Sequence, residues 1–113
     1  MPTIEQHFAR RAPEVRAIYD AIVAAARELG PVMEDPKKTS IHLTRETAFA
    51  GVATRKDAVI LTLKSGSDIK SPRVVRRQRT SANRWHVELR LDDPKQVDGQ
   101  LKGWLRKAVA LAS

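Results

Sequence analysis

The hydrophobic residues of this chain change their spacing twice, and this change restricts the fold more than any other feature. Over residues 13–29 they recur every three or four positions, which is typical of an amphipathic helix. Over residues 41–91 they fall largely at every second position, which is typical of strands with one buried face. Over residues 93–111 the helical spacing returns. We therefore predict a single α+β domain over residues 1–113.

The ends of the helical segments carry residues that commonly begin or end helices. Pro13 suits the first turn of the first long helix, and Gly30, which precedes a proline, is expected to end it. Asp93, also followed by a proline, is expected to cap the C-terminal helix. Near the start of the chain, Thr3 and Gln6 have the spacing of a capping box and predict a short helical turn.

The middle of the chain is expected to form a sheet of about four to five strands. Short turns separate the alternating runs, so neighbouring runs are expected to pair antiparallel. The run at 84–91 alternates most regularly, which predicts one buried face and one wet face. Residues 32–40 are expected to connect the first helix to the edge of the sheet. We thus predict an antiparallel sheet packed against an N-terminal and a C-terminal helix.

The formal net charge of +8 is concentrated in one part of the chain. Residues 54–90 carry ten Lys and Arg against three Asp and Glu, while the flanking parts are nearly balanced. Such an excess favours an anionic partner, either the backbone of a nucleic acid or an acidic protein. Our leading hypothesis is a binding domain that contacts nucleic acid without sequence specificity. The candidate binding residues are Lys37, Lys38, Arg55, Lys56, Arg73, Arg76, Arg77, Arg79 and Arg84.

Two other functional hypotheses remain open. In the first, the domain is a protein-interaction module that docks an acidic partner or forms a homodimer through a sheet edge. In the second, a small anion binds in a pocket on the polar sheet face near His42, His86 and Arg90. The plainest interpretation is a solvated basic face, with the arginines of residues 74–79 protecting an edge strand from aggregation. The chain is expected to be a monomer or a homodimer.

The usual signatures of catalytic, metal-binding and nucleotide-binding sites are missing from the sequence. It has no cysteine, and its three histidines are too far apart for a metal motif. It has neither a nucleophile elbow nor a glycine-rich phosphate loop. We therefore expect no catalytic residue, no metal and no cofactor. No segment has the pattern of a signal peptide or a membrane span, so we expect a cytoplasmic protein without a membrane partner.

Several ordered motifs give the chain a family resemblance. In sequence order they are TIEQHF, DPKKTSIHL, TAFAGVATRKDAVILTL, NRWHVELRL and VDGQLKGWLRKA. With these motifs the chain resembles the bacterial family called domain of unknown function 5655. The resemblance implies a compact helix–sheet–helix domain, and it supplies no catalytic residues.

Overall fold

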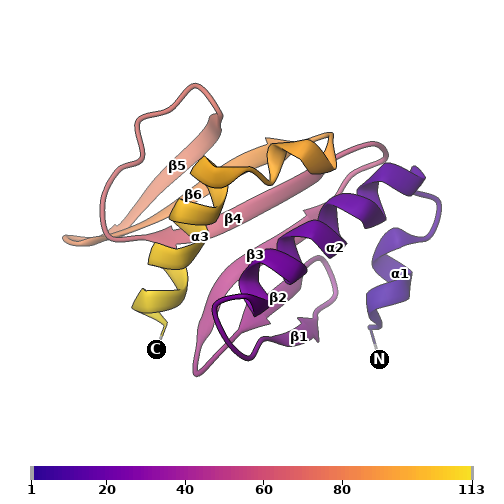
Figure 1. Cartoon of the computed structure of the whole chain (residues 1–113), viewed down its shortest axis with the longest axis horizontal. Helices are drawn as coiled ribbons and strands as arrows, with labels where there is room; N and C mark the ends of the chain where they lie inside the picture. The colour runs from indigo at the N-terminus through magenta and orange to yellow at the C-terminus, as the bar shows by residue number, and fades with distance from the viewer. Residues whose placement is uncertain (1, 113) are drawn as a thin grey trace.

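The structure is a computed structural model that describes residues 2–112 (Figure 1). In this part of the chain, six strands form one antiparallel sheet in the order β1-β2-β3-β4-β6-β5. The predicted α+β fold is confirmed, with one strand more than expected. The strands are β1 (Met33–Pro36), β2 (Ile41–Thr44), β3 (Ala48–Thr54), β4 (Val59–Ser65), β5 (Val74–Ser81) and β6 (Arg84–Leu91). The helices are α1 (Ile4–Phe8), α2 (Pro13–Arg27), the 3-10 helix η1 (Pro94–Gln96) and α3 (Gly99–Leu111).

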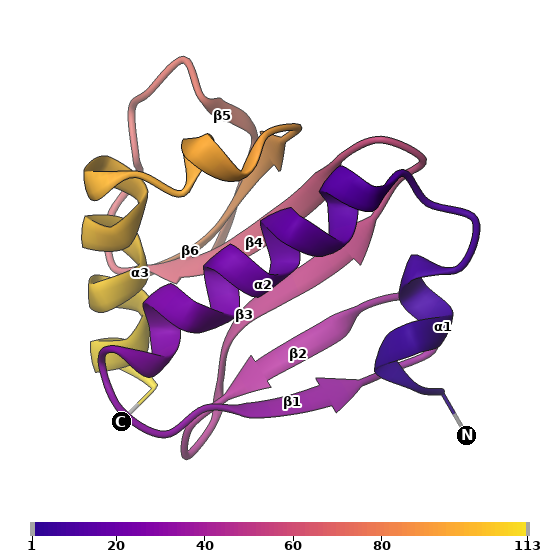
Figure 2. The ribbon, with the colours of Figure 1, turned by 45° about the vertical axis from the view of Figure 1, so that its right-hand side comes forward.

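Helices α2 and α3 lie on the same face of the sheet (Figures 1 and 2). Their apolar stripes pack on alternate residues of the strands and form one hydrophobic core with them. Each leucine or isoleucine that is fully buried there contributes roughly 1.5 to 3 kcal/mol. The largest fully buried side chains are Tyr19, Phe49, Ile18, Ile22, Ile41, Leu43, Leu61, Leu63, Leu89, Leu91, Leu101 and Leu105.

The opposite face of the sheet carries no helix in the described part of the chain (Figure 2). Successive side chains of a strand point to opposite faces, so the neighbours of the buried strand residues point to this open face. One row of cross-strand neighbours on it consists of His42, Gly51, Thr62 and Glu88. The fold thus leaves a polar sheet surface available to a ligand or a partner.

Strand β1 was predicted to be a connection, and that interpretation was wrong. Residues Met33 to Pro36 pair antiparallel with β2 at the edge of the sheet. Two side chains of α2 hold the strand there: Tyr19 Oη donates to Glu34 Oε1 at 2.5 Å, and Arg27 Nη2 donates to Glu34 Oε2 at 3.2 Å. The strand is only four residues long and does not alternate, so its contacts with α2 and β2 identify it, whereas its pattern does not.

The helix caps also differ in part from expectation. Asp93 caps the 3-10 helix η1, and α3 begins later, where the Asp98 side chain accepts a hydrogen bond from Leu101 N. The predicted capping box at the start of the chain is confirmed, since Gln6 N donates to Thr3 Oγ1 and Thr3 N donates to Gln6 Oε1. A short segment separates η1 from α3, and it accepts hydrogen bonds from an arginine side chain described below.

Candidate anion-binding site

Two hairpin turns at one end of the sheet each carry a pair of basic residues. The β1–β2 turn contains Lys37 and Lys38, and the β3–β4 turn contains Arg55 and Lys56. Both turns lie at the same end because the first residue of β2 pairs close to the last residue of β3. All four side chains are exposed. The sheet register therefore brings together two pairs that are 17 positions apart in the sequence.

The link between α1 and α2 brings a third basic pair, Arg10 and Arg11, to the same end. The backbone of this link is bonded to the β3–β4 turn, because Ala12 N donates to Lys56 O at 2.9 Å. Helix α1 is bonded to the other turn, with 2.8 Å between His7 Nε2 and the Lys37 carbonyl oxygen. We call the six residues Arg10, Arg11, Lys37, Lys38, Arg55 and Lys56 the basic end.

Thr54, the last residue of β3, joins these segments and is almost fully buried. Its hydroxyl donates to His7 O at 2.6 Å and accepts from Arg11 Nε at 3.1 Å. A buried hydroxyl needs such partners, because an unsatisfied one costs about 1 to 3 kcal/mol. The contacts join α1 and the following link to the sheet, and the basic end is built on these joined segments.

Half of the cations in the basic end have no polar partner for their side chains within residues 2–112. These are Arg10, Lys38 and Lys56, and all three are exposed. Lys37 pairs with Asp35 at 2.9 Å across the surface. Exposed ion pairs of this kind contribute little to stability. The basic end therefore presents positive charge that the fold itself does not neutralise.

Arg10 also has an unusual backbone conformation. Its φ angle is +62°, in the left-handed region that glycine and asparagine adopt most easily. The conformation reverses the chain between α1 and α2. An arginine there costs backbone energy, on the order of 1 kcal/mol relative to a residue without a β carbon.

The candidate arginines of β5 do not belong to the same surface. Arg76 lies opposite Glu88 on the open face, with 3.8 Å between Nε and the carboxylate. Arg77 lies opposite the buried Val87 and therefore points to the helix-bearing face. Its Nε lies 2.8 Å from the Asp68 carboxylate. The strand thus distributes its charges over both faces of the sheet.

The last two arginines of this region, Arg79 and Arg84, lie near the β5–β6 turn at the other end of β6. Arg79 donates to Ser81 O and Ala82 O, and its guanidinium lies 5.9 Å from the centre of the Trp85 ring. Arg84 is exposed and donates to the carbonyl oxygen of the preceding residue. The nine candidate residues therefore fall into separate groups, and only four of them lie at the basic end.

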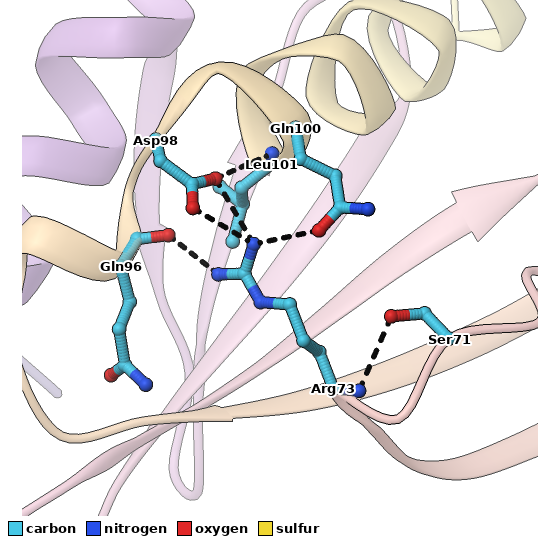
Figure 3. Close-up of polar contacts among 6 residues, drawn as sticks. All are labelled: Ser71, Arg73, Gln96, Asp98, Gln100 and Leu101. Atoms are coloured by element: carbon cyan, nitrogen blue, oxygen red, sulfur yellow. Dashed lines mark hydrogen bonds and ion pairs between the residues drawn. The ribbon is translucent and has the colours of Figure 1, made fainter.

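Arg73 is occupied within the fold, as Figure 3 shows. Its Nη1 donates to both carboxylate oxygens of Asp98, at 3.0 and 3.2 Å, and to Gln100 Oε1 at 3.2 Å. Its Nη2 donates to the Gln96 carbonyl oxygen at 2.6 Å, and the guanidinium lies 5.6 Å from the centre of the Trp104 ring. The side chain is only 22% exposed. Arg73 therefore ties the segment before β5 to the start of α3 and has few donors left for a ligand.

The contacts of Asp98, the ion-pair partner of Arg73, lower its pKa. Two contacts lower the pKa of Asp98: first the hydrogen bond from the Leu101 backbone N–H, and then the one from Arg73. Both contacts favour the charged carboxylate. Asp98 is thus at once the cap of α3 and the counterion of Arg73.

A second candidate site lies on the open face of the sheet. It is a hollow of about 270 Å³. His42 and His86 both line it, as the sequence-based pocket hypothesis requires. The third predicted residue, Arg90, is not among its lining residues, and its guanidinium lies near Asp57 and Asp92 at 3.5 and 3.4 Å. The full lining is Ser40, His42, Ala48, Phe49, Ala50, Gly51, Ala53, Thr62, Lys64 and His86.

Sequence reasoning missed several residues of these two sites, among them three basic ones. Arg10 and Arg11 lie in the N-terminal part of the chain, where acidic and basic residues balance, so the charge count gave no signal. Their adjacency just before Pro13 was the available hint. Lys64 occupies a polar position of a well-predicted strand, and the strand order was needed to place it beside His86.

Taken together, these features define a small two-layer α+β domain with one open sheet face and a basic end. The chain belongs to the family described as Domain of unknown function (DUF5655), whose sequence model matches residues 4–112. Comparisons with curated proteins and with solved structures found no significant match. Within residues 2–112, no three His, Cys, Asp or Glu side chains are grouped so that they could hold a metal ion. No helix there has the length and apolar character needed to cross a bilayer.

Proposed function

We propose that this domain is a non-catalytic binding module that contacts the phosphate backbone of a nucleic acid through its basic end. The observation that carries the proposal is the convergence of three basic pairs from separate segments. Arg10, Lys38 and Lys56 supply charges that the fold leaves without a polar partner in its described residues. Cations that neutralise phosphates release condensed counterions, and this release drives the binding. In line with the predicted localisation, we place this activity in the cytoplasm.

The proposed contact is made to the nucleic-acid backbone and does not depend on the base sequence. The basic end consists of two turns and a link, so no helix of this surface is positioned to enter a major groove. Aromatic residues are 4% of the chain, and both tryptophans lie beside arginines of the fold. Stacking of bases on exposed rings is therefore not part of the proposal. Phosphate contacts position a protein on nucleic acid and carry no direct sequence information.

Salt-dependent binding to a short labelled DNA duplex tests the proposal. The affinity is measured by fluorescence anisotropy between about 50 and 200 mM salt, and the slope of log affinity against log salt is about −0.9 for each phosphate that is neutralised. The triple variant Arg10→Gln, Lys38→Gln, Lys56→Gln is expected to reduce that slope by up to about 2.7. A second duplex of unrelated sequence should bind with similar affinity.

The chain offers a matched control for the loss of three charges. Lys102, Arg106 and Lys107 are exposed on α3, and replacing all three by Gln removes the same net charge elsewhere. The control should keep most of the salt slope. If the two triple variants lose slope equally, binding reflects the overall charge and the proposal fails. It also fails if the unmodified protein does not bind at low salt.

An acidic protein partner is the second candidate function, and the exposed edge of β5 favours it. This eight-residue strand pairs on one side with β6, and Val75 at its bulge is 57% exposed. An extended acidic segment could add to this edge as a further strand. Two copies of β5 pairing with each other would place Arg76, Arg77 and Arg79 of both chains close together, which opposes a homodimer at this edge. Light scattering coupled to size exclusion would reveal such a dimer.

A further inference from the structure

We propose that the hollow on the open sheet face binds a small monocarboxylate with an apolar body. This site is separate from the basic end and does not depend on the function proposed above. Three features of the hollow support the proposal: its floor, the polar side chains at its rim and its size.

Gly51 forms the floor of the hollow. It lies in the middle of β3, directly between His42 on β2 and Thr62 on β4. A β carbon built at Gly51 would meet no atom within 4 Å, so the space above it is open. Glycine inside a strand weakens the strand and often marks a place where another group approaches the backbone. The other apolar lining residues are Ala48, Phe49, Ala50 and Ala53.

The rim carries polar side chains that the fold leaves unused. Five of them, Ser40, His42, Thr62, Lys64 and His86, make no side-chain hydrogen bond or ion pair within the described residues. Lys64 and His86 are direct cross-strand neighbours. Side chains directly opposite each other on one sheet face lie close together, so Lys64 and His86 can both contact one ligand. On β6, the strand that carries His86, the carboxylate of Glu88 pairs with Arg76 and not with Lys64 or His86.

The number of charges selects the ligand class. Lys64 provides one fixed positive charge, while histidine and the hydroxyl side chains provide N–H and O–H donors. This set complements an anion with one charge and two acceptor oxygens. The hollow of about 270 Å³ is somewhat smaller than the roughly 300 to 1,000 Å³ of pockets that hold drug-sized ligands, so it suits a small molecule. Benzoate has this size, an apolar ring for the floor and a carboxylate for the rim.

The three histidines of the chain make a direct binding assay possible. His42 and His86 line the hollow, whereas His7 lies at the basic end with its ring bonded to Lys37 O. Sodium benzoate is titrated at constant ionic strength while the histidine ring resonances are followed by NMR. The expected result is a saturable shift of the His42 and His86 resonances with a Kd on the order of 1 mM, while His7 does not move. Equal shifts of all three histidines, or no shift, would overturn the proposal.

Comparator ligands test the carboxylate and the apolar body separately. Benzamide has the shape of benzoate without the charge, and it should bind at least about tenfold more weakly because it loses the charge-assisted contact. Inorganic phosphate and acetate have charge without a ring and should also bind weakly. If benzamide binds as well as benzoate, the site is not an anion site. If phosphate binds as well, the site does not recognise an apolar body.

Two variants locate the ligand. Gly51→Val fills the hollow with a β-branched side chain that suits a strand, so the fold should persist while benzoate binding is lost. Lys64→Gln should weaken benzoate binding about tenfold or more and leave benzamide binding unchanged. Lys70→Gln removes one charge from an exposed residue outside the hollow and serves as the control. Unchanged benzoate affinity in Gly51→Val, with a native spectrum, would place the ligand elsewhere and refute the proposal.

Discussion

Arg73 and Lys56 both come from the strongly cationic segment between residues 54 and 90, but the fold treats them differently. Arg73 is 22% exposed, and carboxylate, amide and carbonyl oxygens surround its guanidinium. Lys56 is exposed at a turn, and no polar partner of its side chain occurs in the described part of the chain. The comparison shows that local charge density does not decide which cations can bind a ligand. The position of the internal acceptors does.

The largest effect is expected from removing Arg73. Arg73→Gln should destabilise the fold by about 2 kcal/mol, because several hydrogen bonds to a partly buried guanidinium are lost and their acceptors are left without that donor. The salt slope of DNA binding should stay as in the unmodified protein. Urea unfolding and anisotropy titrations measure the two quantities.

Lys56→Gln is the matched control for this comparison. It also removes one positive charge, but it should change the free energy of unfolding by less than about 0.5 kcal/mol. Its salt slope should fall by about 0.9. If Arg73→Gln reduces the slope and Lys56→Gln does not, the distinction between structural and binding cations is reversed.

A smaller effect, and one that depends on pH, is expected at Asp98. Because the pKa of Asp98 is lowered in the fold, the unfolded chain binds its proton more readily. The charged carboxylate therefore stabilises the fold above its unfolded pKa of about 3.9 and loses this effect as the pH falls through the lower folded value. The contribution should be modest, since the side chain is 48% exposed.

The variant Asp98→Asn isolates this contribution. Asparagine can still cap α3, but it cannot serve as a counterion for Arg73. The unmodified protein should be more stable than the variant near neutral pH, and the difference should shrink as the pH falls below about 4. Thermal unfolding across this range measures it. A difference that stays constant with pH would mean that the Asp98 charge does not contribute.

The sequence predicted the elements of the fold better than it predicted the site. Strong alternation identified β3, β4 and β6, and helical spacing identified α2 and α3. Strand β1 escaped because its position depends on the contacts of Glu34 with α2. The start of α3 was misplaced because Asp93 and Asp98 both have the residue type of a cap, and only the chain path distinguishes them.

The composition of the basic end depends on long-range register, which explains why five of the nine predicted residues lie elsewhere. Lys37 and Arg55 lie at the same end of the sheet because β2 and β3 pair, and Arg11 is held at that end by its hydrogen bond to Thr54. None of these contacts is visible in local sequence patterns. Conversely, the β5 arginines are adjacent in sequence, but alternation along the strand separates Arg76 from Arg77. Neighbours in the sequence thus point to opposite faces of the sheet, while pairs that are far apart in the sequence lie at the same end of it.

The smallest effect on stability is expected at Arg10. Arg10→Gly relieves the left-handed backbone conformation at φ +62°, which favours the folded state by on the order of 1 kcal/mol. Glycine also makes the unfolded chain more flexible, which costs about 0.4 to 1 kcal/mol. The two terms nearly cancel, so the free energy of unfolding should change by less than about 0.5 kcal/mol.

DNA affinity, in contrast, should fall about tenfold near 0.1 M salt when Arg10 loses its charge, as expected for one lost phosphate contact. Arg10→Gln keeps the β carbon and should show the same loss of affinity without the relief of backbone strain. Together these variants separate what the residue costs the fold from what its charge contributes to binding. A marked loss of stability in Arg10→Gly would instead assign Arg10 to the structural set with Arg73, and an unchanged affinity would remove it from the basic end.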